Sequence, residues 1–174
     1  MLISVLLDPR ADLLVRRRGI EDAEARQLLA RHDLAARESM LLASCMAGMA
    51  FSSAGLGLCH AMAHQPGAAL HIPHGLANAM LLPTVMEFNR MVCRERFSQI
   101  GRALRTKKSD DRDAINAVSE LIAEVGIGKR LGDVGATSAH YGAWAQAALE
   151  DICLRSNPRT ASLEQIVGLY AAAQ

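Results

Sequence analysis

Four histidines lie within fifteen consecutive positions of this chain, namely His60, His64, His71 and His74. On a helix, His60 and His64 stand four residues apart and project from one face. Neutral imidazole nitrogens bind transition metals, and imidazole also exchanges protons near neutral pH. Two histidines at this spacing are a weak signal alone, but His74, between a proline and a glycine at an expected helix start, adds a third imidazole. The pattern predicts a site for metal binding or proton transfer, and the residue types leave iron and zinc open.

These histidines belong to a long stretch without charged side chains. No Asp, Glu, Lys or Arg occurs in the 48 residues from Ser39 to Met86. Because burying a charge is costly, such a stretch is expected in a protein interior. Met40–Ala63 is also long enough to span a bilayer, but its serines and glycines and its lack of aromatic or basic flanks favour a buried helical hairpin. The methionines in and beside this hairpin are predicted to fill the core: Met40, Met46, Met49, Met62, Met80 and Met86.

The composition favours packed helices over sheets or disorder. The chain has 174 residues, only 3% aromatic side chains and a net charge of +1, so it gives no electrostatic reason to bind nucleic acid or a membrane surface. Met1–Leu7 is apolar but lacks a preceding basic segment, which makes it a poor signal peptide. The cysteines form no CxxC pair and are predicted to be small buried hydrophobic residues of a cytoplasmic protein: Cys45, Cys59, Cys93 and Cys153.

The apolar periodicity predicts an all-α bundle of several helices. A buried helix is expected at Glu38–Phe51, and a second at Leu56–His64 that ends at Pro66 because proline cannot donate the helical hydrogen bond. A third should start at His74 and run toward Arg90, with a kink or a new helix start at Pro83. The remaining boundaries come from capping and turn residues: Asp110 and Asp111 at a helix start, Gly126 at its end, Ser138 at the next start, a turn at Asn157-Pro158-Arg159 and a capping box at Ser162–Gln165.

The stretch from Arg37 to Asn89, RESMLLASCMAGMAFSSAGLGLCHAMAHQPGAALHIPHGLANAMLLPTVMEFN, resembles the helical C-terminal domain of the iron-containing (group III) alcohol dehydrogenases. The resemblance continues through Glu120–Gly135 and the SNPR segment, Ser156–Arg159. It divides the chain into a divergent N-terminal segment, 1–36, and an iron-alcohol-dehydrogenase-like helical domain, 37–174. It implies NAD(P)-linked interconversion of an alcohol and an aldehyde or ketone, with a small alcohol or carbonyl compound as substrate.

The resemblance also implies roles for the histidines. His60 and His74 would be metal ligands, and His64 would be the catalytic histidine that faces the nicotinamide ring and relays a proton. The metal would be Fe²⁺, with Zn²⁺ as the alternative, acting as a Lewis acid on the substrate oxygen. His71 is expected beside the site, and His32 and His140 on the surface. With only two neutral ligands, His64 or His71 could complete a weaker, zinc-like site. Cys59 should point away from His60 into the core.

The chain departs from the family in two ways. The family supplies two further metal ligands from a DxxxH pair that, counted back from His60, would lie before residue 1. The N-terminal α/β domain with its glycine-rich dinucleotide site is also missing, and Gly55-Leu56-Gly57 is no substitute because GxGxxG fails at His60. No residue here is therefore predicted to bind NAD or NADP. Asp12, Asp22 and Asp33 are candidates to replace the absent metal carboxylate.

Two hypotheses follow from these departures. In the first, the chain is the catalytic helical domain of an iron-dependent oxidoreductase and is inactive unless a nucleotide-binding partner chain or a longer product supplies the rest. In the second, it is a non-catalytic remnant, a weak metal binder or a helical protein that self-associates as a homo-oligomer through apolar surface.

Overall fold

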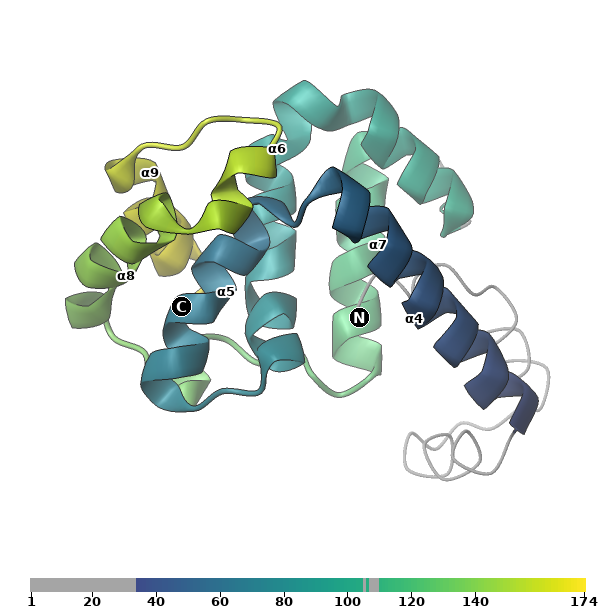
Figure 1. The fold of residues 1–174 in the computed structure, drawn as a ribbon, viewed down its shortest axis with the longest axis horizontal. Helices are drawn as coiled ribbons and strands as arrows, with labels where there is room; N and C mark the ends of the chain where they lie inside the picture. Colours follow the sequence, from purple (N-terminus) through teal and green to yellow (C-terminus); the bar gives the residue numbers. More distant parts are fainter. Residues whose placement is uncertain (1–33, 105, 107–109) are drawn as a thin grey trace. The chain divides into compact units, whose positions relative to one another are not determined.

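The computed structural model describes residues 34–104, 106 and 110–174, and within these ranges the chain forms helices and no strand (Figure 1). The predicted all-α fold is confirmed. Contacts divide the chain into two compact units, Met1–Ser53 and Ala54–Gln174. The predictions for Met1–Leu7, His32, Asp12, Asp22 and Asp33 lie outside the described residues. The elements are α4 (Leu34–Ala54), α5 (Gly57–Leu70), α6 (His74–Ala103), α7 (Asp111–Glu124), the 3₁₀ turn η1 (Gly132–Val134), α8 (Ser138–Glu150), the 3₁₀ turn η2 (Ile152–Ser156) and α9 (Leu163–Ala172).

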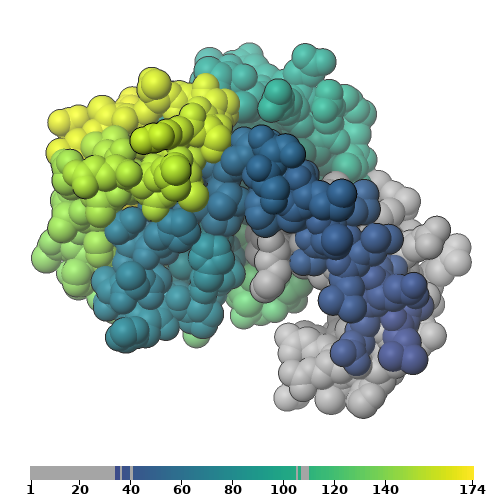
Figure 2. Space-filling view, in the orientation of Figure 1, coloured from purple at the N-terminus to yellow at the C-terminus, as the bar shows by residue number. Residues whose placement is uncertain are grey.

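Helix α4 forms where a helix was predicted, but of its described side chains only Ala43 and Ala47 are buried. Leu41, Leu42 and Met49 are 71%, 61% and 69% exposed, and Figure 2 shows α4 at the surface in dark blue. The prediction that this helix is buried was wrong. An uncharged helix can be buried at low cost, but it is buried only where another part of the protein packs against it. Within the residues described, no single helix is long and apolar enough to cross a bilayer. One broken pair, Arg37–Ala54 with Gly57–Leu70, passes the same test on combined length and composition.

The exposure of α4 also corrects two predictions about individual side chains. Met46 and Met49 are exposed, whereas Met62, Met80 and Met86 are buried as expected. Among the cysteines, Cys59 and Cys93 are buried, Cys153 is half-buried and Cys45 is exposed; all four are free thiols. The apolar character of these residues therefore predicted burial correctly only in α5 and α6.

Helix α5 runs through Pro66 to Leu70, so the prediction that it ends at Pro66 was wrong. Proline has no N–H and leaves the carbonyl four residues earlier, that of Met62, without its helical partner. The Tyr170 hydroxyl of α9 donates a hydrogen bond to this carbonyl at 2.7 Å, from a fully buried position. The Met62 carbonyl, which loses its helical partner because of Pro66, is therefore hydrogen-bonded by a residue 108 positions later in the sequence, and the helix continues.

We expect Tyr170→Phe to lower the free energy of unfolding by about 1–3 kcal/mol, because it leaves the buried Met62 carbonyl unsatisfied while keeping the ring. Tyr141→Phe is the matched control: the Tyr141 hydroxyl is buried and has no hydrogen-bond partner among the described residues. Its removal should be neutral or stabilising. Urea unfolding followed by circular dichroism measures both. Equal effects of the two substitutions would contradict the role given to Tyr170.

The first turn of α5 is capped from a distant part of the sequence. The Gly57 N–H donates to Ser156 Oγ (3.1 Å) and the Leu58 N–H donates to Asn157 Oδ1 (3.1 Å). Gly57 has φ +75°, a left-handed conformation that favours glycine at this entry to the helix. Ser156 and Asn157 thus take the place of a local N-cap, which Leu56 cannot provide. The predicted turn at Asn157 is therefore also the cap that fixes the start of the helix carrying His60 and His64.

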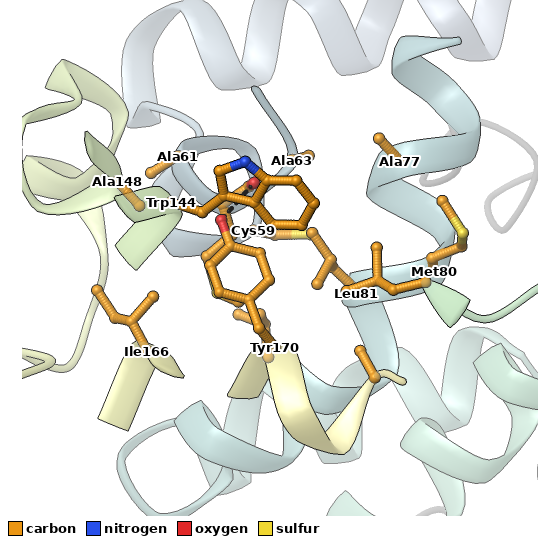
Figure 3. Packing of buried hydrophobic residues seen from close by; sticks show 14 of the residues in the cluster. Cys59, Ala61, Ala63, Ala77, Met80, Leu81, Trp144, Ala148, Ile166 and Tyr170 are labelled. Atoms are coloured by element: carbon orange, nitrogen blue, oxygen red, sulfur yellow. Dashed lines mark hydrogen bonds between the residues drawn. The ribbon is translucent and has the colours of Figure 1, made fainter. Parts of the chain in front are cut away.

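Helix α5 is the centre of the second unit. Figure 1 shows α8 and α9 on one side of it and α6, followed by α7, on the other. Trp144 of α8 and Tyr170 of α9 pack with ring centroids 5.5 Å apart, next to Leu81 of α6 (Figure 3). Leu58, Ala61 and Met62 are fully buried in this core, which fixes the rotation of α5 about its axis. The opposite face of α5 therefore points away from the core. That face carries the histidines.

The other boundaries follow the predicted signals with two corrections. Asp110 caps α7 by accepting the Asp113 N–H, Gly126 follows the end of α7 at φ +75°, and Ser162 and Gln165 form the capping box of α9. Helix α8 starts at Ser138, but Thr137 rather than Ser138 is its N-cap. Helix α6 leaves helical geometry at Cys93 (φ −122°, ψ 16°) instead of at Pro83. Neither proline nor glycine occurs next to Cys93, so no neighbouring residue type predicts this kink.

Candidate metal and proton-transfer site

Three of the four clustered histidines meet at one place. His60 and His64 come from successive turns of α5, and His74 is the first residue of α6. The His60 and His74 ring centroids lie 5.2 Å apart, those of His64 and His74 5.5 Å, and those of His60 and His64 6.2 Å. The predicted convergence of these three side chains is therefore present.

His60 is the most deeply placed of the three. Burial, together with the neighbouring His74 and His64, lowers the pKa of His60 to about 4, while Asp151 acts weakly in the opposite direction. Near neutral pH its ring is uncharged and keeps a nitrogen lone pair. This is the protonation state that a metal ligand requires.

His74 lies at the open end of the cluster and is exposed. The Asn78 side-chain amide, one turn later on α6, donates to the His74 carbonyl (3.0 Å) and lies 3.2 Å from His74 Nε2. Asn78 Oδ1 is buried and has no hydrogen-bond partner within the described ranges. Asn78 therefore orients the His74 ring and contributes an unsatisfied oxygen beside it.

His64 makes a contact that the sequence did not predict. Its Nδ1 lies 2.7 Å from Asp151 Oδ2, at the junction of α8 and η2. Burial opposes the ionisation of Asp151, but hydrogen bonds from His64 and Cys153 outweigh it and hold the Asp151 pKa below its ordinary value. Asp151 is therefore ionised near neutral pH and forms a charge-assisted contact with the imidazole.

Cys59 confirms the predicted orientation away from the site. Its thiol is buried and reaches the Asn78 carbonyl at 3.6 Å. Burial raises the pKa of this thiol to about 12, so it stays protonated near neutral pH. A protonated, buried thiol is a packing group rather than a metal ligand.

The spacing of His60 and His74 fits one shared metal ion. Two imidazoles that bind an ion through nitrogens about 2.1 Å away have ring centres about 5 Å apart. The observed 5.2 Å agrees with this value. The described part of the chain also contains a second group of ligand-type atoms, from His64, Asp151 and Cys153, that lie within 4.8 Å of one another. His64 Nδ1 is thus directed toward Asp151.

The two other histidines of the described ranges, His71 and His140, do not join the cluster. His71 is exposed and ends α5 in a left-handed conformation at φ 52°. His140 is half-buried rather than on the surface, since its ring stacks on Trp144 at 4.9 Å and its Nδ1 accepts the Thr137 N–H. Sequence reasoning missed Asp151 and Asn78. Asn78 follows His74 by four residues, a spacing from which a contact on one helix face could have been predicted. For Asp151 the sequence offers only its position five residues before the SNPR segment.

A family comparison now adds to this geometry. The model of the Fe-containing alcohol dehydrogenase family, C-terminal part, matches residues 22–174. The chain therefore belongs to the iron-containing alcohol dehydrogenase family, in which it corresponds to the helical C-terminal domain. The match begins before residue 37, where we predicted the domain to start, and the two compact units meet after Ser53. The boundary at residue 37 stays a prediction.

The curated relatives are alcohol and aldehyde oxidoreductases. Over 142 residues the chain is 86% identical to the "Probable alcohol dehydrogenase EutG" of Salmonella typhimurium (strain LT2), covering 82% of this chain and 36% of that protein. It is 45% identical over 147 residues to lactaldehyde reductase of Escherichia coli (strain K12), covering 81% of this chain and 38% of that protein. The chain thus spans little more than a third of the length of these relatives.

Solved structures show the same fold. A crystal structure of 1,3-propanediol oxidoreductase matches 99% of this chain and 44% of its own with a TM-score of 0.82 at 32% identity. Alcohol dehydrogenase from Oenococcus oeni matches 87% of this chain and 41% of its own with a TM-score of 0.81 at 38% identity. In both, the matched part is less than half of the protein.

Proposed function

We propose that this chain is the metal-binding helical part of an NAD(P)-linked oxidoreductase that interconverts a small alcohol and an aldehyde or ketone. The observation that carries the proposal is the pairing of His60 with His74 at 5.2 Å, with the pKa of His60 lowered so that its ring is neutral. Family membership supports the reaction type, because the curated relatives carry alcohol dehydrogenase and lactaldehyde reductase names.

In this proposal His60 and His74 hold the metal, Fe²⁺ by family and Zn²⁺ as the alternative. A bound ion would supply Lewis acidity toward the substrate oxygen. Burial keeps His60 neutral, and the Asn78 amide donates to the His74 carbonyl in the first turn of α6. Two neutral imidazoles compensate a dication poorly, so the DxxxH pair of the family would complete the site from outside these 174 residues.

His64 is the proposed catalytic residue for proton transfer. It stands one turn beyond His60 and its side chain is 38% exposed, so it contacts both the site and solvent. A histidine in this position can accept the hydroxyl proton of an alcohol and release it to water. In the family, the histidine at this position faces the nicotinamide of NAD or NADP, and no residue of this chain is proposed to hold that cofactor.

The alternative function, a self-associating or weakly metal-binding helical protein, is favoured by α4. This helix exposes Leu41, Leu42, Met46 and Met49 together, and an apolar face of this kind favours association with another protein surface. Either a second copy of the chain or a nucleotide-binding partner chain could cover this apolar face of α4. The free thiols are compatible with the cytoplasmic location that we propose.

The function is tested with the chain alone and in a chimera. Purified chain with Fe²⁺, NAD⁺ or NADP⁺ and short alcohols should show no nicotinamide reduction by absorbance. A chimera in which this chain replaces the matching part of the Salmonella relative should show it, and His64→Gln should lower its kcat by about 100-fold or more.

The control is the relative itself, expressed and assayed in parallel. Turnover by the chain alone would contradict the need for residues from outside it. An inactive chimera beside an active relative would overturn the proposed function and favour the self-associating alternative.

A further inference from the structure

We propose that Asp151 is a positioning residue for His64. Its carboxylate fixes the imidazole in the tautomer that carries the proton on Nδ1 and leaves the lone pair on Nε2. The inference rests on the proposed function of His64, which it deepens. It is drawn from the contact between two residues that lie 87 positions apart in the sequence.

The geometry around Asp151 supports a fixed carboxylate. Oδ2 lies 2.7 Å from His64 Nδ1, and Oδ1 accepts the Cys153 N–H at 2.8 Å. Both oxygens are therefore engaged, one by the backbone and one by the imidazole. The Asp151 side chain is only 15% exposed, so few alternative positions are open to it.

An ionised carboxylate can only accept a hydrogen bond. The 2.7 Å contact consequently requires a proton on His64 Nδ1, and in the neutral ring this places the lone pair on Nε2. Without the carboxylate, neutral imidazole in water favours the opposite tautomer. Asp151 thus decides which nitrogen is available to accept a proton.

Hydrogen bonds from backbone N–H groups hold Asp151 and His64 in the positions that allow this contact. Asp151 stands where α8 ends, and its side chain caps η2, the turn that leads to Ser156. Ser156 and Asn157 in turn cap the start of α5, the helix that carries His64. The same short segment therefore positions both the carboxylate and the helix, and this arrangement holds the two side chains together without help from a bound group.

The test is nitrogen-15 NMR of histidine-labelled full-length chain at pH 8 with a chelator present, and His64→Gln identifies the His64 signals. Long-range proton–nitrogen correlations distinguish the protonated ring nitrogen from the one with the lone pair. We expect His64 to be protonated on Nδ1 in the unsubstituted chain. Asp151→Asn should shift the two nitrogen resonances toward the Nε2–H pattern, because its amide oxygen still caps Cys153 but its negative charge is lost.

Asp110→Asn is the matched control, since it removes the same charge from another capping aspartate and leaves a good N-cap. It should leave the His64 signals unchanged. A lone pair on Nδ1 in the unsubstituted chain would overturn the inference, as would an unchanged His64 pattern in Asp151→Asn. This measurement involves no turnover, so it can fail while the chimera is active, and it can succeed while the chimera is inactive.

Discussion

Asn157→Ala is expected to lower the free energy of unfolding by about 2–4 kcal/mol, because one side chain satisfies several groups of α5 and α6. Asn157 Oδ1 accepts the Leu58 N–H and also the Asn89 amide, and Asn157 Nδ2 donates back to Asn89 Oδ1. Asn89 is the one amide or charged side chain that is buried among the described residues, so it would lose this partner inside the protein. The substitution also removes a cap from the helix that carries His60.

Urea unfolding measures this change, and Asn116→Ala is the matched control. Asn116 lies exposed on α7, where alanine has the higher helix propensity. The control should therefore be neutral or slightly stabilising. A cost below about 0.5 kcal/mol for Asn157→Ala would contradict the role of the SNPR segment as a cap, because even a simple cap contributes about that much.

The histidine cluster could be predicted from the sequence because its geometry is local. The i, i+4 spacing of His60 and His64 fixes their common face on any helix, and His74 follows after a short connection. Capping residues such as Asp110 and Ser162 were also predictable, since each bonds a backbone group three residues away. Contacts of this kind depend on the order of residues along the chain alone.

The parts that could not be predicted depend on contacts distant in sequence. Pro66 predicts a helix end unless a donor reaches the Met62 carbonyl, and that donor is Tyr170. Asp151 has no local pattern that connects it with His64. In α4, the absence of charge gave the expectation of burial, but Leu41 and Leu42 have no covering element among the described residues. The composition of a segment indicates whether its burial is favourable. Whether another segment covers it or bonds to it depends on the tertiary structure.

His60→Ala and His74→Ala are each expected to weaken metal binding by about 100-fold or more. Loss of an outer hydrogen-bond partner of a ligand alone costs about 10–100-fold, and loss of one of only two ligands should cost at least as much. The effect should be similar for both residues because, in the proposed site, their rings, 5.2 Å apart, would share one ion.

Two histidine substitutions serve as matched controls. His71→Ala removes an exposed imidazole that ends α5, and His64→Ala removes the ring that contacts Asp151. Neither residue is a ligand in this account, so both variants should retain the metal affinity of the unsubstituted chain. His64→Ala also separates the pair of His60 and His74 from the group formed by His64, Asp151 and Cys153.

Anaerobic calorimetric titration of the chain with Fe²⁺, repeated with Zn²⁺, tests the metal site most directly. We expect one weak site in the unsubstituted chain, retained in His64→Ala and His71→Ala and lost in both His60→Ala and His74→Ala. Unchanged affinity in the last two variants, or loss of the site in His64→Ala alone, would contradict the assignment of His60 and His74 as the metal ligands.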